Sequence, residues 1–237
     1  MRQVYRRQGA GVKIILEGGQ GEIEEKKSRF IATVKCVNSQ EEAAAFITAI
    51  KKQYWDARHN CSAYVIGERG ELAHSSDDGE PAGTAGRPML AVLQGENLTN
   101  VCVVVTRYFG GVLLGTGGLV RAYSAAVQAG LGACRIAECI DGFRLRVGTD
   151  YNGIGKLQYL LAQRQLPVTD TLYGESVEIE TLVPEAEAAA LMEDITQKTL
   201  GKAEFLVCDP VRYAREESGV TVLGARAAAR AESTRVQ

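Results

Sequence analysis

The sequence Val101-Cys-Val-Val-Val-Thr106 runs directly into Arg107-Tyr-Phe-Gly-Gly-Val-Leu-Leu-Gly-Thr-Gly-Gly-Leu-Val-Arg-Ala-Tyr123. The first stretch is apolar and β-branched, which predicts a central strand of a sheet. From Leu119 onward, apolar positions recur at the spacing of one helix face. The segment therefore predicts a strand, a glycine-rich loop over residues 110–118 and a helix. The glycines of this loop are Gly110, Gly111, Gly115, Gly117 and Gly118.

The glycine-rich loop has two interpretations. Glycines let backbone N–H groups approach a ligand, so Gly110–Gly118 with the cations Arg107 and Arg121 could bind a phosphate or carboxylate. The loop lacks the spacing of a P-loop and of the G-x-G-x-x-G fingerprint. The alternative is that the glycines only form turns and close helix–sheet contacts, which is common without a ligand.

A second polar loop is predicted from His74 to Gly86. It carries Asp77, Asp78 and Glu80, which could bind a metal or serve acid–base chemistry together with His59 and His74. Neither histidine has the spacing of a metal-ligand pair, so no metal is predicted. We favour a loop whose acids cap backbone N–H groups or that forms a partner surface.

The segment Asp56-Ala-Arg-His-Asn-Cys-Ser-Ala-Tyr64 predicts a strand on which His59 and Cys61 share a face. That spacing is compatible with a Cys/His nucleophile, but no orienting Asp or Asn is positioned beside it. A buried structural cysteine is the favoured interpretation. No catalytic residue is predicted.

The rest of the first half predicts mixed secondary structure. Residues 29–37 alternate as a strand, and Ser39 with Glu42 forms a capping-box pattern before a helix. A short helix is predicted to start at Pro88 and to end near Gly95. We expect residues 1–135 to form the first domain.

The second half has a clearer pattern. Strands, helices and turns alternate in the order βαββαβ, which is the ferredoxin-like order. We therefore expect a ferredoxin-like domain over 138–212, a polar and flexible tail over 213–237, and an α+β fold class overall. The predicted elements are 140–147, 153–165, 167–172, 176–183, 184–198 and 203–208.

Four motifs in order resemble the YigZ/IMPACT family. They are Lys27–Ala32, Ala57–Cys61, Ser76–Pro88 and Arg107–Tyr123. The resemblance implies a two-layer N-terminal α/β domain, of the fold shared by GHMP kinases and a ribosomal small-subunit protein domain, with a left-handed β-α-β crossover. It also implies a C-terminal domain like the last domain of elongation factor G.

The resemblance also implies a connection with translation. Eukaryotic IMPACT proteins restrain an amino-acid-starvation kinase by binding its activator, through a different N-terminal domain that this sequence lacks. That contact is therefore not carried over. We expect a non-enzymatic regulatory or binding protein that contacts protein or RNA of the translation machinery through the motif loops. The alternatives are a phosphate- or nucleotide-binding protein or enzyme at Gly110–Gly118, and a scaffold without a ligand.

Composition limits the function classes. Net charge is −2, but residues 1–135 carry 16 basic and 13 acidic side chains, and residues 136–237 carry 11 and 16. The acidic half is a poor footprint for non-specific nucleic-acid binding. No secretory signal, membrane span or Cys-x-x-Cys pair occurs, so we expect a cytoplasmic protein with reduced cysteines. No cofactor is predicted, and the sequence leaves the oligomeric state open.

Overall fold

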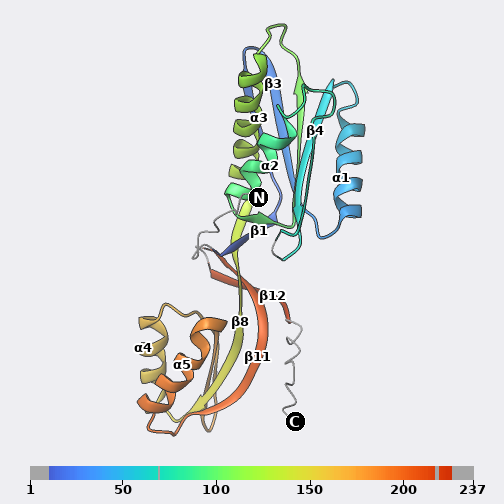
Figure 1. Cartoon of the computed structure of the whole chain (residues 1–237). Coiled ribbons are helices and arrows are strands. Elements are labelled where there is room, and N and C mark those ends of the chain that lie inside the picture. Colours follow the sequence, from blue (N-terminus) through green and yellow to red (C-terminus); the bar gives the residue numbers. More distant parts are fainter. Residues whose placement is uncertain (1–10, 69, 217–218, 226–237) are drawn as a thin grey trace, which may run out of the picture. The chain divides into compact units, whose positions relative to one another are not determined.

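The computed structural model describes residues 11–68, 70–216 and 219–225 (Figure 1). The chain divides into two compact units, with the division between Glu138 and Cys139. Both units combine strands with helices, which confirms the predicted α+β class.

Unit 1 is built on a five-stranded sheet in which all neighbours are antiparallel. Its central strand is β7 (Val101–Tyr108), in which every residue from Val101 to Arg107 is buried. This confirms the predicted central strand. The order across the sheet is β2 (Gln20–Glu25), β3 (Ser28–Cys36), β7, β4 (His59–Ile66) and β5 (Leu72–Ser76).

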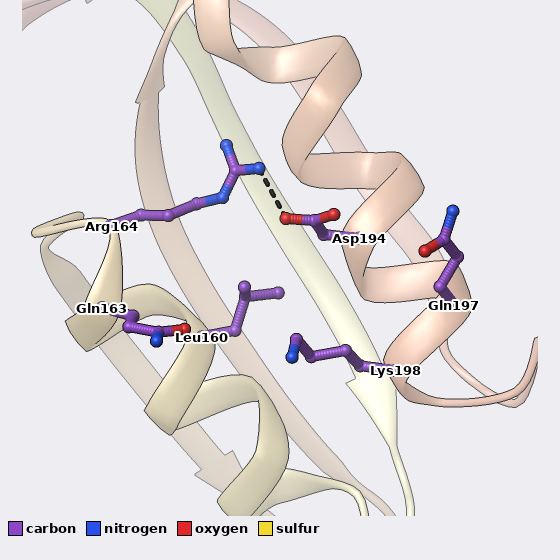
Figure 2. Close-up of a pocket in the computed structure, with 6 residues that line it drawn as sticks. All are labelled: Leu160, Gln163, Arg164, Asp194, Gln197 and Lys198. Atoms are coloured by element: carbon purple, nitrogen blue, oxygen red, sulfur yellow. Dashed lines mark hydrogen bonds and ion pairs between the residues drawn. The ribbon is translucent and has the colours of Figure 1, made fainter.

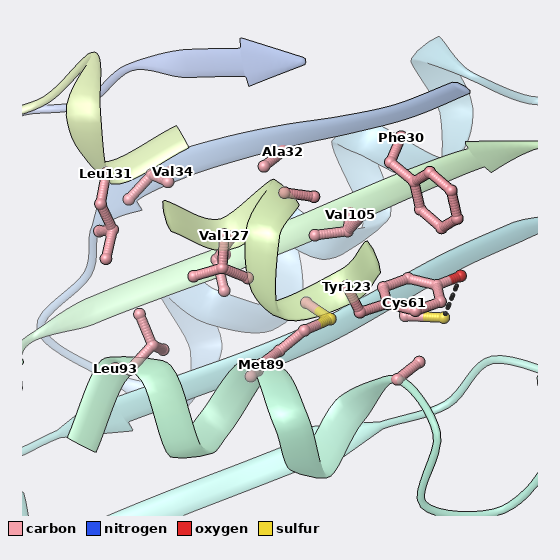
Figure 3. Close-up of a cluster of buried hydrophobic side chains, with 14 of the residues drawn as sticks. Phe30, Ala32, Val34, Cys61, Met89, Leu93, Val105, Tyr123, Val127 and Leu131 are labelled. Atoms are coloured by element: carbon pink, nitrogen blue, oxygen red, sulfur yellow. Dashed lines mark hydrogen bonds between the residues drawn. The ribbon is translucent and has the colours of Figure 1, made fainter. Parts of the chain in front are cut away.

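Helices cover both faces of this sheet. α1 (Gln40–Gln53) packs on the face that holds Cys102, whereas α2 (Gly86–Gly95) and α3 (Gly115–Gly132) pack on the face that holds Val103 (Figures 1 and 3). The expected two-layer arrangement was therefore wrong. Because β7 is apolar on both of its faces, both faces have to be covered.

The core between the sheet and the helices α2 and α3 is the larger of the two in unit 1. Figure 3 shows side chains of β3, α2 and α3 meeting there. The ring of Tyr123 contacts that of Phe30 edge to face, with centroids 5.2 Å apart. Fully buried members from α2 and α3 include Met89, Leu93, Tyr123 and Val127.

The ends of the elements follow local sequence signals. Ser39 caps α1, because its hydroxyl accepts a hydrogen bond from the Glu42 N–H at 3.2 Å. The Glu42 carboxylate accepts from the N–H of Asn38, one residue before the position that a capping box predicts. The chain before Ser28, for which no element was predicted, forms β2 and β1 (Val12–Glu17), and β1 pairs in parallel with β6 (Leu98–Thr99).

Unit 2 contains the six elements in the predicted order. These are β8 (Arg135–Thr149), α4 (Ile154–Gln163), β9 (Val168–Tyr173), β10 (Val177–Pro184), α5 (Glu185–Lys198) and β11 (Glu204–Glu216). The strand order is β9-β10-β8-β11, and β10 is antiparallel to both β8 and β9. α4 and α5 bury Leu157, Leu161, Leu191 and Ile195 against one face of the sheet.

The chain continues as regular structure where the sequence predicted a tail from residue 213. β11 extends to Glu216 and pairs with β12 (Gly219–Ala225). Tyr213 is fully buried and packs with Val211 and Leu182. Burial of these apolar side chains explains why this segment is a strand. The remainder of the predicted tail, residues 226–237, lies outside the described residues.

Candidate functional site

The glycine segment forms a shorter loop than predicted. β7 ends at Tyr108 and α3 begins at Gly115, so only residues 109–114 connect them. Gly117 and Gly118 thus lie in the first turn of α3, and the predicted loop over 110–118 was too long. Gly111 and Gly115 have φ angles of 82° and 72°, which glycine adopts without strain and which set the path of this turn.

Gly110 fixes the turn against the neighbouring hairpin. A side chain at this position would place its Cβ 2.0 Å from the carbonyl oxygen of Lys27, so only glycine fits. The Gly110 N–H donates a hydrogen bond to the Ser28 hydroxyl at 3.1 Å. The first and fourth sequence motifs are therefore in contact.

An apolar surface projects from this turn. Phe109, Val112 and Leu113 are exposed, and the Leu113 side chain is 82% exposed. We call residues 109–113 the tip. The predicted site residue Arg121 is exposed on α3, and its guanidinium lies over the first turn of that helix, beside Gly117.

The acidic loop begins later than predicted, because β5 extends through Ser76. The Asp77 carboxylate accepts hydrogen bonds from the backbone N–H groups of Gly83 (2.7 Å), Ala85 (3.0 Å) and Gly86 (2.8 Å). Burial acts to raise the pKa of Asp77, but these three hydrogen bonds together hold it below the ordinary value. Asp77 thus closes the loop and caps the start of α2.

Asp78 connects the acidic loop to β4. Its carboxylate lies 2.6 Å from the Lys51 ammonium and accepts a hydrogen bond from the Asn60 N–H at 2.7 Å. The Asp78 carbonyl oxygen lies 2.9 Å from Nδ1 of His59. His59 therefore contacts the backbone of the acidic loop.

Glu80 is the centre of a buried polar network. Its Oε1 lies 2.6 Å from Nη1 of Arg107 and accepts a hydrogen bond from the Tyr123 hydroxyl at 2.9 Å. The Cys61 thiol lies 3.3 Å from that hydroxyl, a contact drawn in Figure 3. Arg107 also lies over the rings of Phe30 and Phe109.

Burial decides the chemistry of the thiol in this network. It raises the pKa of Cys61 to about 12 and raises the pKa of Tyr123 as well. The Cys61 thiol is therefore protonated at neutral pH, which argues against a Cys/His nucleophile formed with His59. The buried structural cysteine remains the interpretation that fits this environment.

The structure brings part of the predicted set together. Hydrogen bonds through Cys61 and Tyr123 link Asp77 to Glu80 and Arg107. Asp78 joins the same group from the acidic loop, because it contacts His59 and Asn60 next to Cys61 on β4. Within the described part of the chain, Arg121 forms no hydrogen bond or ion pair with this network, and His74 lies on β5 against the ring of Tyr64. Sequence reasoning missed Tyr123 and Lys51 as members, although Tyr123 lies within the glycine motif.

No group of three His, Cys, Asp or Glu side chains among residues 11–68, 70–216 and 219–225 is placed to hold a metal ion. No described helix is both long and apolar enough to cross a membrane.

Known proteins resemble both units. Residues 26–131 match the Impact N-terminal domain, and residues 147–202 match a domain of unknown function, DUF1949. The IMPACT family member YvyE of Bacillus subtilis is 46% identical over 191 residues, which cover 81% of this chain and 88% of the relative. Protein IMPACT of Rattus norvegicus is 37% identical over 99 residues, 39% of this chain and 30% of the relative.

A solved structure also covers most of the chain. It is described as the crystal structure of a hypothetical protein, and it matches with a TM-score of 0.51 at 33% sequence identity. The match covers 84% of this chain and 97% of the solved one.

Proposed function

Since the chain belongs to the IMPACT family, we propose that it is a non-enzymatic, translation-associated regulatory or binding protein. In this proposal the tip contacts a protein or RNA of the translation machinery. The proposal includes a cytoplasmic location.

One observation supports a binding role over a catalytic one. The carboxylates of the acidic loop have partners within the protein: backbone N–H groups for Asp77, Lys51 for Asp78 and Arg107 for Glu80. These groups build and fix the loops. The surface that the glycine turn exposes to solvent is the apolar tip, and the glycines set the path of that turn. Exposed apolar residues on a rigid turn are suited to protein or base contacts.

The connection with translation rests on the family. The match to the Impact N-terminal domain, residues 26–131, falls within unit 1, the unit that carries the tip. We propose that unit 1 shares the fold of GHMP kinases and the ribosomal small-subunit domain, with helices on both faces of the sheet in place of the expected two layers. We propose that unit 2 is ferredoxin-like, which its strand order β9-β10-β8-β11 and its two helices on one face support.

Sedimentation with ribosomes tests this function. The full chain is centrifuged with ribosomes over a salt series, together with Leu113→Asp and the control Trp55→Asp. Trp55 is a matched control because it is 83% exposed, in the same unit, outside the tip. We expect cosedimentation at low salt that Leu113→Asp reduces at least about tenfold, the effect of removing one strong contact. Absence of cosedimentation at every salt concentration would contradict the proposal.

A second candidate function has its own observation. The N-terminus of α3 has no side-chain cap, and Arg121 lies over its first turn. A phosphate or nucleotide would find backbone N–H donors and a cation there. Thermal unfolding with ATP, GTP and inorganic phosphate tests this candidate. A ligand at 100 times its Kd stabilises the folded state by about 2.7 kcal/mol, and Arg121→Ala should remove that stabilisation.

A further inference from the structure

Unit 2 contains a surface hollow that the proposed function does not use. It lies between α4 and α5 and has a volume of ≈ 570 Å³. Its floor is the buried side chain of Leu160, and Figure 2 shows Lys198 reaching from α5 across toward α4. A smaller hollow beside it is lined by Lys156 and Tyr159 and shares Lys198.

The two hollows are locally basic, although this half of the chain is acidic overall. Lys156, Arg164 and Lys198 line them, and Asp194 is the only acidic lining residue. Asp194 is already paired with Arg164 at 2.5 Å. Across the described part of the chain, neither Lys156 nor Lys198 has a carboxylate within ion-pair distance. Two ammonium groups are therefore available to an anion.

An aromatic ring and an amide group lie beside these cations. Tyr159 is 63% exposed on α4, one turn from Lys156, so one face of its ring can be covered by a ligand. Gln163 carries an amide that can both donate and accept hydrogen bonds. A flat ring can stack on the tyrosine while a phosphate contacts the lysines.

We infer that the surface between α4 and α5 binds a nucleotide unit, that is, a planar heterocycle carrying at least one phosphate. The phosphate contacts Lys156 and Lys198, and the base stacks on Tyr159. The Gln163 amide contacts the edge of the base. Free nucleotides and single-stranded RNA both supply this chemistry.

The geometry also sets the expected strength. The volume lies within the range of small-ligand sites, but the hollow is open and its lysines are exposed. The binding should therefore depend strongly on salt, because exposed charges are screened. For single-stranded RNA, removing one phosphate contact should lower the slope of log K against log salt by about 0.7.

The test measures binding to the full chain by fluorescence anisotropy. One arm uses fluorescent AMP and ATP, and the other uses fluorescent single-stranded RNA of increasing length. The variants are Tyr159→Ala and the pair Lys156→Gln/Lys198→Gln. The controls are Tyr173→Ala, which removes a tyrosine that is 66% exposed elsewhere in unit 2, and Lys202→Gln, which removes an exposed lysine that lines neither hollow.

We expect Tyr159→Ala to weaken binding about 5- to 150-fold, as for other stacking aromatics. The lysine pair should weaken it and flatten the salt dependence, and both controls should bind as the wild type does. Equal affinity for AMP and RNA identifies a free nucleotide as the source, and affinity that rises with RNA length identifies RNA. Absence of binding in both arms at 50 mM salt, or binding that the variants do not change, would overturn the inference.

This inference rests on unit 2 alone. Leu113→Asp, which tests the tip, should leave nucleotide or RNA binding to unit 2 unchanged. A failure of ribosome binding and a failure of this site can therefore be told apart.

Discussion

Glu80 and Arg107, 27 positions apart in sequence, form an ion pair of 2.6 Å in which the side chains are only 3% and 8% exposed. The pair joins the acidic loop to the central strand of unit 1. Because the pair is buried, water does not solvate either charge, and each charge is stabilised by the other.

Neutralising one member of this pair should destabilise unit 1 strongly. Glu80→Gln leaves the Arg107 charge uncompensated, so we expect a loss of about 3–5 kcal/mol in the free energy of unfolding. Urea denaturation followed by far-UV circular dichroism measures it. The double variant Glu80→Leu/Arg107→Met should recover part of the loss. A single variant as stable as the wild type would show that the pair is not a structural anchor.

Asp77 should make the stability of unit 1 depend on pH in the acidic range. Its folded pKa lies below the unfolded value of about 3.8. Its contribution is therefore complete above that value and is lost as the pH falls through the folded pKa. Asp77→Asn should be less stable than the wild type at neutral pH, and the gap should narrow in acid. Urea midpoints measured from pH 7 down to pH 3 for both proteins check this, and a gap that stays constant would contradict it.

Thiol reactivity should separate the buried cysteines from an exposed one. Burial raises the pKa values of Cys61 and Cys102 to about 12, whereas Cys208 is exposed. Iodoacetamide at pH 7.5 should therefore modify Cys208 in the folded protein and leave the two buried thiols unmodified. Mass spectrometry of the digested protein reads the sites, and urea-unfolded protein is the control. If Cys61 were labelled as fast as Cys208, that result would support a reactive role for the Cys61 thiol.

Gly110 should tolerate no side chain. Gly110→Ala places a Cβ against the backbone of Lys27, which cannot rotate away, so we expect a loss of about 1–3 kcal/mol. Gly132→Ala is the matched control, because that glycine ends α3 with open space around its Cβ position. The control should be at least as stable as the wild type. Thermal unfolding of both variants measures the difference, and equal stability of the two would contradict it.

Much of the fold could be predicted where local patterns were strong. The apolar run of β7 and the Ser39 cap of α1 were read correctly, and so was the order of elements in unit 2. The start of α3 was placed too late, because the glycines at residues 115, 117 and 118 have poor helix propensity. β12 was not predicted. Val220 and Val222 have the two-residue spacing of a strand face, but the segment around them is polar, and the strand is defined only by its pairing with β11.

The contacts of the candidate network could be predicted less well from the sequence. The motifs identified His59, Asp77, Asp78 and Glu80, but no local pattern tells whether a carboxylate faces solvent or a buried arginine. That outcome depends on contacts between β4, β7, α3 and the loop, which are distant in sequence. Tyr123 was missed as a member of the network for the same reason, because its hydrogen bond to Glu80 joins α3 to the loop.

The central place of β7 has a consequence for how the protein is made. β3 and β4 do not pair with each other, and each pairs only with β7 on its inner edge. During synthesis, therefore, the strands of residues 28–36 and 59–66 wait for residues 101–108 to leave the ribosome before the sheet of unit 1 can close. Such long-range pairing slows folding. Until then β3 pairs only with β2, and β4 only with β5. The inner edge of β3 stays open for about 70 residues of elongation and that of β4 for about 40, a period in which chaperones would find these edges exposed.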